Sequence, residues 1–225
     1  MVAFSNAKIN IGLQILGKRN DGYHDLQSCM HPINLNDVLE VNTQFPQSTF
    51  PFELNYSGLP FNDSTDNNLC LKAYRLLKKD FANLPDVRFH LHKVIPSEAG
   101  LGGGSSNASF TLKLLNNKFE LGLSEYQLSV YAAQLGSDCP FFIQNTTCIV
   151  RGKGEVIEPL KINFNGYKIF ILKPNIHINT GNAFQKVKSI SEPIDLKSAL
   201  QQPIETWKEN IFNDFEKIIF PENPL

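Results

Sequence analysis

A glycine-rich run near the middle of the chain has the residue types of a phosphate-binding loop. Glycine adopts positive φ angles without steric cost, so its backbone N–H groups can converge on one anion. An apolar stripe at helical spacing starts at Ala108, and the first turn of a helix adds unpaired N–H groups and the positive end of its dipole. We expect the run to bind phosphate, with Ser105 or Ser106 as the N-cap of the helix. The run reads Pro96-Ser97-Glu98-Ala99-Gly100-Leu101-Gly102-Gly103-Gly104-Ser105-Ser106-Asn107.

Other phosphate loops fit this run less well. A dinucleotide-binding fingerprint needs glycine where Ser105 stands, and a Walker loop needs a Gly-Lys-Ser/Thr step, which this sequence lacks. A flexible surface turn stays open as the alternative, because clusters of glycine and serine commonly form turns.

Three polar residues outside the run could contact a substrate. Lys8 and Asn10 stand on one face of a strand predicted at residues 7–15, where apolar and polar residues alternate. Side chains on one strand face can reach the same ligand, although a solvated face explains the pair equally well. Asp138 stands in a turn that we expect between a helix ending at Gly136 and an apolar strand at residues 141–143. An aspartate there is more often a turn former than a catalytic base.

Aromatic and histidine residues occur in two further places. Tyr23 and His24 follow a charged turn, where they could stack on a ring and hydrogen-bond its edge or simply begin a strand. His90 and His92 alternate with inward apolar residues on a strand predicted at residues 87–92. Two histidines at this spacing could bind a metal, but no third ligand is evident, so a solvated face is the favoured interpretation.

Composition narrows the class of partner. The chain has 225 residues, 42% of them hydrophobic, and a formal net charge of −1. A nucleic-acid or membrane-surface binder needs a basic excess, so we expect a small-molecule partner, with no nucleic acid and no membrane. The four cysteines lack Cys-x-x-Cys spacing, no signal peptide precedes them, and no stretch is apolar enough to span a membrane. These features predict a cytoplasmic protein with reduced thiols.

The elements that must position these residues alternate between strands and helices. We expect a helix capped by Asp66, the strand that leads into the glycine-rich run, the helix after that run and a further helix capped by Ser124. Beyond them, residues 169–172 predict a buried strand and short helices follow. The one soft boundary falls near Pro159, which divides the chain into residues 1–158 and 159–225.

Several separated motifs together resemble the GHMP family of small-molecule kinases. Their order and spacing are similar to those of the branch that phosphorylates 4-diphosphocytidyl-2-C-methyl-D-erythritol in non-mevalonate isoprenoid biosynthesis. The resemblance covers residues 5 to about 216, and Asp21-Gly22-Tyr23-His24 separates this branch from homoserine, mevalonate and galactose kinases. The other motifs are Lys8-Ile9-Asn10, the glycine-rich run, Leu135-Gly136-Ser137-Asp138-Cys139-Pro140-Phe141-Phe142 and Gly152-x-Gly154-Glu155.

The resemblance implies roles for the residues within these motifs. Asp138 would accept the proton of the substrate hydroxyl, and Lys8 would keep that carboxylate ionised. Tyr23 and Phe184 would sandwich a cytosine ring while His24 hydrogen-bonds its edge.

The resemblance also implies ligand contacts and cofactors. Asn10 would contact the diphosphate or a hydroxyl of the substrate. ATP would be the phosphoryl donor and would bring Mg²⁺, for which the sequence names no metal ligand. The ATP contacts expected are Pro96, Gly100, Leu101, Gly102, Gly103, Gly104, Ser105, Ser106, Asn68 and Lys93.

The fold implied by the resemblance is the α+β, two-lobed GHMP kinase, with its active site in the cleft between the lobes. Residues 1–158 would form the N-terminal lobe and residues 159–225 a shortened C-terminal lobe. Members of the family carry a third glycine-rich motif, which this sequence does not reach, so we expect a truncated chain and a poor kinase. A GHMP kinase for another substrate and a catalytically inactive nucleotide-binding module remain alternatives, while the retention of Lys8 and Asp138 favours an active enzyme.

Overall fold

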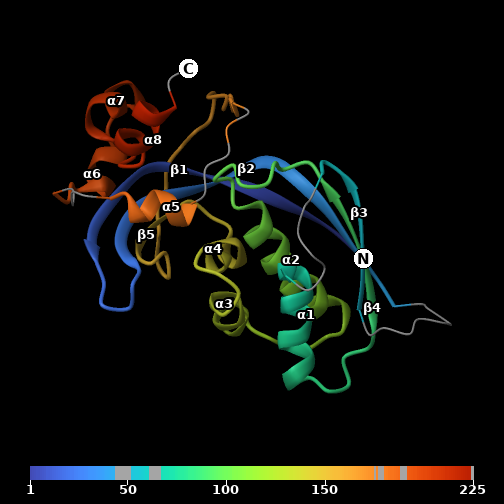
Figure 1. Ribbon diagram of the computed structural model, residues 1–225. Helices are drawn as coiled ribbons and strands as arrows, with labels where there is room; N and C mark the ends of the chain where they lie inside the picture. The colour runs from blue at the N-terminus through green and yellow to red at the C-terminus, as the bar shows by residue number, and fades with distance from the viewer. Residues whose placement is uncertain (44–51, 61–66, 175, 177–179, 188–191, 224–225) are drawn as a thin grey trace. The chain divides into compact units, whose positions relative to one another are not determined.

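The computed structural model describes residues 1–43, 52–60, 67–174, 176, 180–187 and 192–223. Three strands come first, strands and helices follow in turn as far as β6, and short helices end the described part of the chain (Figure 1). The strands are β1 (Val2–Lys18), β2 (His24–Asn42), β3 (Phe52–Gly58), β4 (Val87–Lys93), β5 (Cys148–Gly152) and β6 (Val156–Pro159). The helices are α1 (Leu69–Asp80), α2 (Gly103–Lys118), α3 (Glu125–Ala133), α4 (Cys139–Gln144), α5 (Thr180–Gln185), α6 (Leu196–Leu200), η2 (Ile204–Thr206), α7 (Trp207–Asn210) and α8 (Glu216–Glu222).

The chain divides into two compact units, each built from separate segments. The first unit contains Met1–Lys8, Pro32–Ser97 and Leu101–Asn145, and the second contains Ile9–His31, Glu98–Gly100 and Thr146–Leu225. This division differs from the expected single boundary near residue 158, because the long strands β1 and β2 each contribute residues to both units. Local sequence patterns do not show which distant segments pair.

A region of sheet that includes β2, β3 and β4 forms one layer of the first unit. In it, β3 pairs in parallel with β4, and β4 pairs antiparallel with residues Val38–Asn42 of β2. Val87, Phe89 and Leu91 of β4 are buried whereas His90 and His92 are exposed, which confirms the predicted alternation. Helices α1 and α2 lie side by side against this unit's core.

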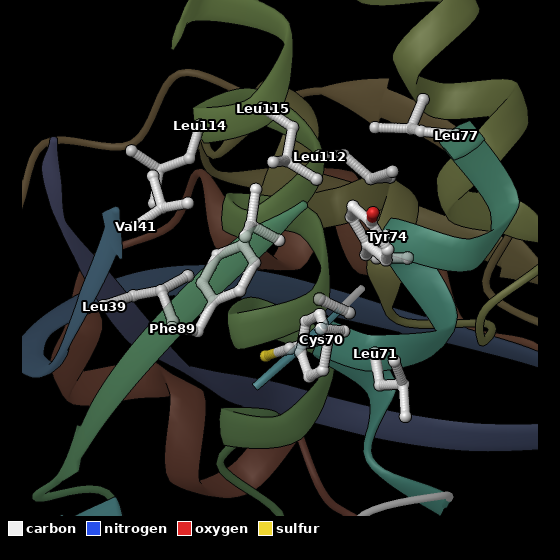
Figure 2. Packing of buried hydrophobic residues seen from close by; sticks show 14 of the residues in the cluster. Leu39, Val41, Cys70, Leu71, Tyr74, Leu77, Phe89, Leu112, Leu114 and Leu115 are labelled. Atoms are coloured by element: carbon white, nitrogen blue, oxygen red, sulfur yellow. The ribbon is translucent and has the colours of Figure 1, made fainter. Parts of the chain in front are cut away.

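The core of the first unit lies between its strands and helices. Figure 2 shows side chains from separate elements directed toward one another: Leu39 from β2, Phe89 from β4, Tyr74 from α1, and Leu112 and Leu115 from α2. All five are at most 2% exposed. Burial of side chains of this size stabilises a fold by about 1.5–3 kcal/mol each, so this core holds the elements that carry the glycine-rich run.

A second sheet region and a set of short helices form the second unit. Residues Leu26–Met30 of β2 pair antiparallel with β5, and β5 pairs antiparallel with β6. A smaller core gathers Cys29, Ile149, Leu160, Leu196 and Leu200. Helix α6, which carries Leu196 and Leu200, therefore packs against the strands of the same unit.

Two predicted strands are wrong. Residues 141–143 lie in helix α4. The prediction failed because three consecutive apolar residues show no periodicity that would distinguish a buried strand from a buried helix. Pro140 stands in the first turn of α4, where proline is tolerated. Residues 169–172 form no strand, and Phe170 is 90% exposed, since the described part of the chain supplies no strand that pairs with them.

The starts of two helices also differ from expectation. Helix α1 begins at Leu69 with Asn68 as its N-cap, while Asp66 lies outside the described residues. Helix α2 begins at Gly103 with Gly102 as its N-cap, so the expected caps Ser105 and Ser106 lie inside the helix. Gly102 has a φ of 69°, a left-handed value that favours glycine over serine. The capping box of Ser124 and Gln127 at the start of α3 is confirmed.

Candidate active site

Lys8 and Asp138 meet in the first unit. The Lys8 Nζ and Asp138 Oδ2 atoms are 3.3 Å apart, and the two side chains are 7% and 30% exposed. The backbone N–H of Lys8 donates to the carbonyl of Leu101 at 2.9 Å, which attaches the strand of Lys8 to the glycine-rich run. The structure therefore places an ammonium and a partly exposed carboxylate beside a candidate phosphate loop.

Helix α4 fixes the position of Asp138, which is its N-cap residue. Two side chains of α2 bond to the backbone of α4: Ser109 Oγ donates to the carbonyl of Cys139 at 2.7 Å, and Lys113 Nζ donates to that of Phe142 at 3.0 Å. Burial lowers the pKa of the Lys113 ammonium. The helix that begins at the phosphate loop thus also holds the candidate base.

The other end of α4 is attached to the strand of Lys8. Asn145, the C-cap of α4 in left-handed conformation, donates through Nδ2 to Asn6 Oδ1 at 2.8 Å. Asn6 lies two residues before Lys8 on β1. Both ends of this six-residue helix therefore contact β1, one through Asp138 and one through Asn145.

Gly102 lies where a side chain does not fit. A Cβ atom at this position would lie 2.9 Å from the Phe142 ring and 3.1 Å from Cγ of Lys8. Real Cβ atoms almost never come this close to a carbon, so glycine allows the loop backbone to approach Lys8 and the aromatic ring.

The start of α2 presents backbone donors without a side-chain cap. The first intrahelical bond joins the N–H of Ser106 to the carbonyl of Gly102 at 2.8 Å, so the amides of Gly103, Gly104 and Ser105 precede the hydrogen-bonded ladder. The Oγ of Ser106 is buried without a hydrogen-bond partner among the described residues. Amides ahead of the helical ladder, and a hydroxyl that no described residue bonds, are suited at a helix N-terminus to a phosphate group.

The structure places the two expected adenosine contacts, Asn68 and Lys93, in internal hydrogen bonds. Asn68 Oδ1 accepts the N–H of Cys70 at 2.7 Å, and its Nδ2 donates to the hydroxyl of Tyr56 at 2.8 Å. The Lys93 side chain is only 2% exposed, and its ammonium forms an ion pair with Asp37. A role for either residue in binding adenosine stays a prediction.

The expected substrate contacts Asn10, Tyr23, His24 and Phe184 all belong to the second unit. The His24 and Phe184 rings are stacked, with centroids 5.3 Å apart and planes 20° from parallel. Tyr23 is 59% exposed. Asn10 Nδ2 donates to Ser28 Oγ at 2.7 Å. The structure thus brings His24 and Phe184 together and leaves the Tyr23 ring at the surface.

The charged turn before Tyr23 is held by its own side chains. Arg19 pairs with Asp21 at 3.3 Å and with Asp25 at 2.7 Å, and the hydrogen bonds that it donates to these carboxylates raise the pKa of its guanidinium. Sequence reasoning missed Lys153, whose ammonium lies 4.8 Å from the centroid of the Tyr23 ring. Lys153 lies in the turn between β5 and β6, and its place in the sequence gave no sign of this distant contact, which covers a ring face with positive charge.

Comparison with known proteins decides the family. Residues 68–146 match the GHMP kinases N terminal domain. A protein of Bacteroides thetaiotaomicron named 4-diphosphocytidyl-2-C-methyl-D-erythritol kinase is 45% identical over 225 residues, which are 100% of this chain and 81% of that protein. This chain belongs to the 4-diphosphocytidyl-2-C-methyl-D-erythritol kinase family. The family is one of small-molecule kinases that use ATP.

Solved structures agree with this membership. The crystal structure of a 4-(cytidine 5'-diphospho)-2C-methyl-D-erythritol kinase matches with a TM-score of 0.75 and 27% identity, covering 100% of this chain and 79% of that one. The mevalonate kinase of Methanococcus jannaschii matches with a TM-score of 0.60 and 16% identity over 98% of this chain and 71% of that one, which shows the fold alone. The α+β GHMP kinase fold expected from the motifs is therefore confirmed.

Proposed function

We propose that Lys8 and Asp138 form the catalytic pair in ATP-dependent phosphorylation of the 2-hydroxyl of 4-diphosphocytidyl-2-C-methyl-D-erythritol. The family's reaction transfers a phosphoryl group to that hydroxyl. The observation that carries the proposal is the 3.3 Å contact between the Lys8 ammonium and the Asp138 carboxylate, next to Gly102 of the candidate phosphate loop.

Asp138 acts as the general base in this proposal. Its carboxylate is partly exposed, so it can accept the proton that the attacking hydroxyl loses. Lys8 places a positive charge next to that carboxylate and next to the transferring phosphoryl group, where negative charge must be stabilised. The fixed contacts of α4 hold the base in place before substrate binds.

The loop before α2 binds the phosphates of ATP in this proposal. The amides of Gly103, Gly104 and Ser105, the Ser106 hydroxyl and the helix dipole supply the donors and the field that an anion needs. Mg²⁺ bound with ATP would supply further positive charge to the phosphates. The described residues contain no group of three or more His, Cys, Asp or Glu side chains that could hold a metal ion.

The second unit recognises the cytosine in this proposal. Tyr23 and Phe184 offer aromatic faces and His24 a ring nitrogen, which together are suited to a planar base with polar edges. Asn10 supplies an amide to a polar group of the same substrate. The mechanism thus assigns phosphoryl transfer to residues of the first unit and recognition of the base to residues of the second.

A cytoplasmic location is also part of the proposal. The four cysteines are free thiols and all are buried, and burial raises the pKa of Cys29, Cys139 and Cys148 to about 12. Thiols of such high pKa hardly form the reactive thiolate at neutral pH. No helix in the described part of the chain has the length and apolar character needed to cross a membrane.

Replacement of Asp138 by asparagine tests the catalytic pair. Asp138→Asn keeps the size of the side chain and removes the base, so we expect kcat to fall at least about a hundredfold while the KM for ATP changes less than about threefold. Steady-state kinetics with ATP and 4-diphosphocytidyl-2-C-methyl-D-erythritol measure both constants. Asp86→Asn, the same change at an exposed site of the first unit, is the control and keeps normal kinetics. Normal kcat in Asp138→Asn would remove this residue from the mechanism.

A further inference from the structure

A buried carboxylate, Asp37, lies beside the candidate phosphate loop in the first unit. Its side chain is 0% exposed and forms an ion pair with Lys93, which is 2% exposed. The Asp37 Oδ2 atom also accepts Nδ2 of Asn107 at 2.9 Å, and Lys93 Nζ donates to Asn107 Oδ1 at 3.2 Å. Three side chains from β2, β4 and α2 therefore form one buried polar cluster.

The second oxygen of Asp37 binds the backbone that leads into the loop. Its Oδ1 atom accepts the N–H of Val94 at 2.7 Å and the N–H of Ile95 at 2.8 Å. These are the first two residues after β4 and the last two before Pro96. One carboxylate thus fixes the path of the chain as it enters the phosphate loop.

The same cluster fixes the chain where it leaves the loop. Asn107 lies in the second turn of α2 and also donates through Nδ2 to Ser5 Oγ at 2.8 Å. A Cβ atom on Gly103 would lie 3.0 Å from Cγ2 of Ile95 and 3.4 Å from Lys93 Nζ, so the first residue of α2 packs directly on this cluster. Asp37 therefore joins the entry strand of the loop to its exit helix.

Stability alone is a poor explanation for such a cluster. A buried ion pair contributes little net stability, because the loss of hydration of two charges offsets most of their attraction, and apolar residues of similar volume commonly do as well. What a fully bonded carboxylate provides is fixed geometry, since it accepts two backbone amides and two side chains at once.

We infer that Asp37 is a positioning residue for ATP, which holds the phosphate loop in its binding conformation through Val94, Ile95 and Asn107, with Lys93 as its buried counter-ion. The inference rests on the proposed role of the loop in binding the phosphates of ATP. It gives Lys93 a role through Asp37, in place of the contact with adenosine that the sequence predicted.

Two variants of the cluster test this inference. Asp37→Asn removes the negative charge and leaves one oxygen for the two amides, so we expect the KM for ATP to rise at least about tenfold while the KM for the cytidine substrate changes less than twofold. The double variant Asp37→Asn with Lys93→Met contains no unpaired buried charge, so we expect it to regain thermal stability but to keep a KM for ATP at least about fivefold raised. A loss of stability alone would reduce the amount of folded enzyme and leave both KM values unchanged.

Hydrogen exchange gives a second measurement that does not depend on turnover. We expect the amides of Val94 and Ile95 to exchange at least about tenfold faster in both variants, because each has lost the carboxylate that binds these donors. Asp86→Asn is again the matched control and keeps normal exchange and kinetics.

The outcomes separate failure of this inference from failure of the proposed function. A normal KM for ATP in folded Asp37→Asn, or its return to normal in the double variant, overturns the inference. Failure of both variants to fold assigns the cluster to folding alone and overturns it too. If Gly102→Val, which disturbs the loop itself, leaves the KM for ATP unchanged, the role of the loop is wrong; if it raises that KM and Asp37→Asn does not, only the inference fails.

Discussion

The two units hold their candidate functional residues in different ways. In the first unit Lys8 is 7% exposed, and the helix that carries Asp138 is bonded at both ends to neighbouring elements. In the second unit Tyr23 is 59% exposed, and its ring contacts the side chain of Lys153. Chemistry needs groups fixed before the reaction begins, whereas a planar base can be bound by ring faces that adjust around it. The difference indicates that substitutions in the first unit change the catalytic rate or ATP binding, and that those in the second change affinity for the cytidine substrate.

The largest effect is expected where the first unit is packed most tightly. Gly102→Val places a branched side chain where even a Cβ atom would lie 2.9 Å from the Phe142 ring, at a φ of 69°. The loop must move away from Lys8, so we expect kcat/KM for ATP to fall at least about a hundredfold, which corresponds to roughly 2.7 kcal/mol of transition-state stabilisation.

Gly122→Ala is the control that separates the clash from backbone strain. Gly122 has a φ of 70°, and no atom lies within 4 Å of the position of a Cβ. We expect this variant to lose about 1–2 kcal/mol of stability for the left-handed backbone and to keep its kinetics. Equal kinetic losses in the two variants would show that strain, not the fit against Phe142 and Lys8, controls the loop.

A smaller and more selective effect is expected in the second unit. Tyr23→Ala removes an exposed aromatic face, so binding of the cytidine substrate should weaken by about 1–3 kcal/mol, the range for one base on an aromatic platform, with little change in ATP affinity. Titration calorimetry with each ligand measures both. Tyr23→Phe keeps the ring and should bind normally, and a loss of ATP affinity equal to that of the substrate would contradict the division of labour between the units.

The smallest effect concerns the stability of the second unit at low pH. His31 is half-buried, its Nδ1 lies 2.7 Å from Thr147 Oγ1, and burial lowers the pKa of its imidazole below 6.5. The unfolded chain then binds a proton at a higher pH than the folded chain does, so stability falls as the pH drops below about 6.5. Urea unfolding at pH 7.5 and 5.5 should show a smaller loss in His31→Gln than in the unaltered chain, and equal losses would contradict the assignment.

Sequence periodicity predicted those elements whose pattern is local. The alternation in β4 and the capping box of Ser124 appear as expected, because a few neighbouring residues determine each of them. Helix α4 was missed, since Phe141, Phe142 and Ile143 are all buried and consecutive burial has no period. The N-cap of α2 was placed too late, because serine commonly caps helices and the left-handed Gly102 does so here.

The sequence identified candidate site residues by their types and motifs, but it did not predict most of the contacts that these residues make. The motifs that suggested Lys8 and Asp138 name two residues 130 positions apart, and the structure places them 3.3 Å from each other. Asp37 gave no signal, because a single aspartate in an alternating strand looks like any solvated residue. Its burial depends on β4 and α2, which pack around it from far along the chain.

The passage of β2 through both units has a consequence for synthesis on the ribosome. Residues Leu26–Met30 are made early, but their partner strand β5 begins only at Cys148, more than a hundred residues later. Ribosomes add about 5–20 residues per second. The edge of β2 that pairs with β5 therefore stays unpaired for roughly 6–24 s. An edge left open that long can pair with another nascent chain. Codons that slow translation between residues 31 and 147 should therefore lower the yield of folded kinase. Chaperones that bind exposed strands of the nascent chain should restore that yield.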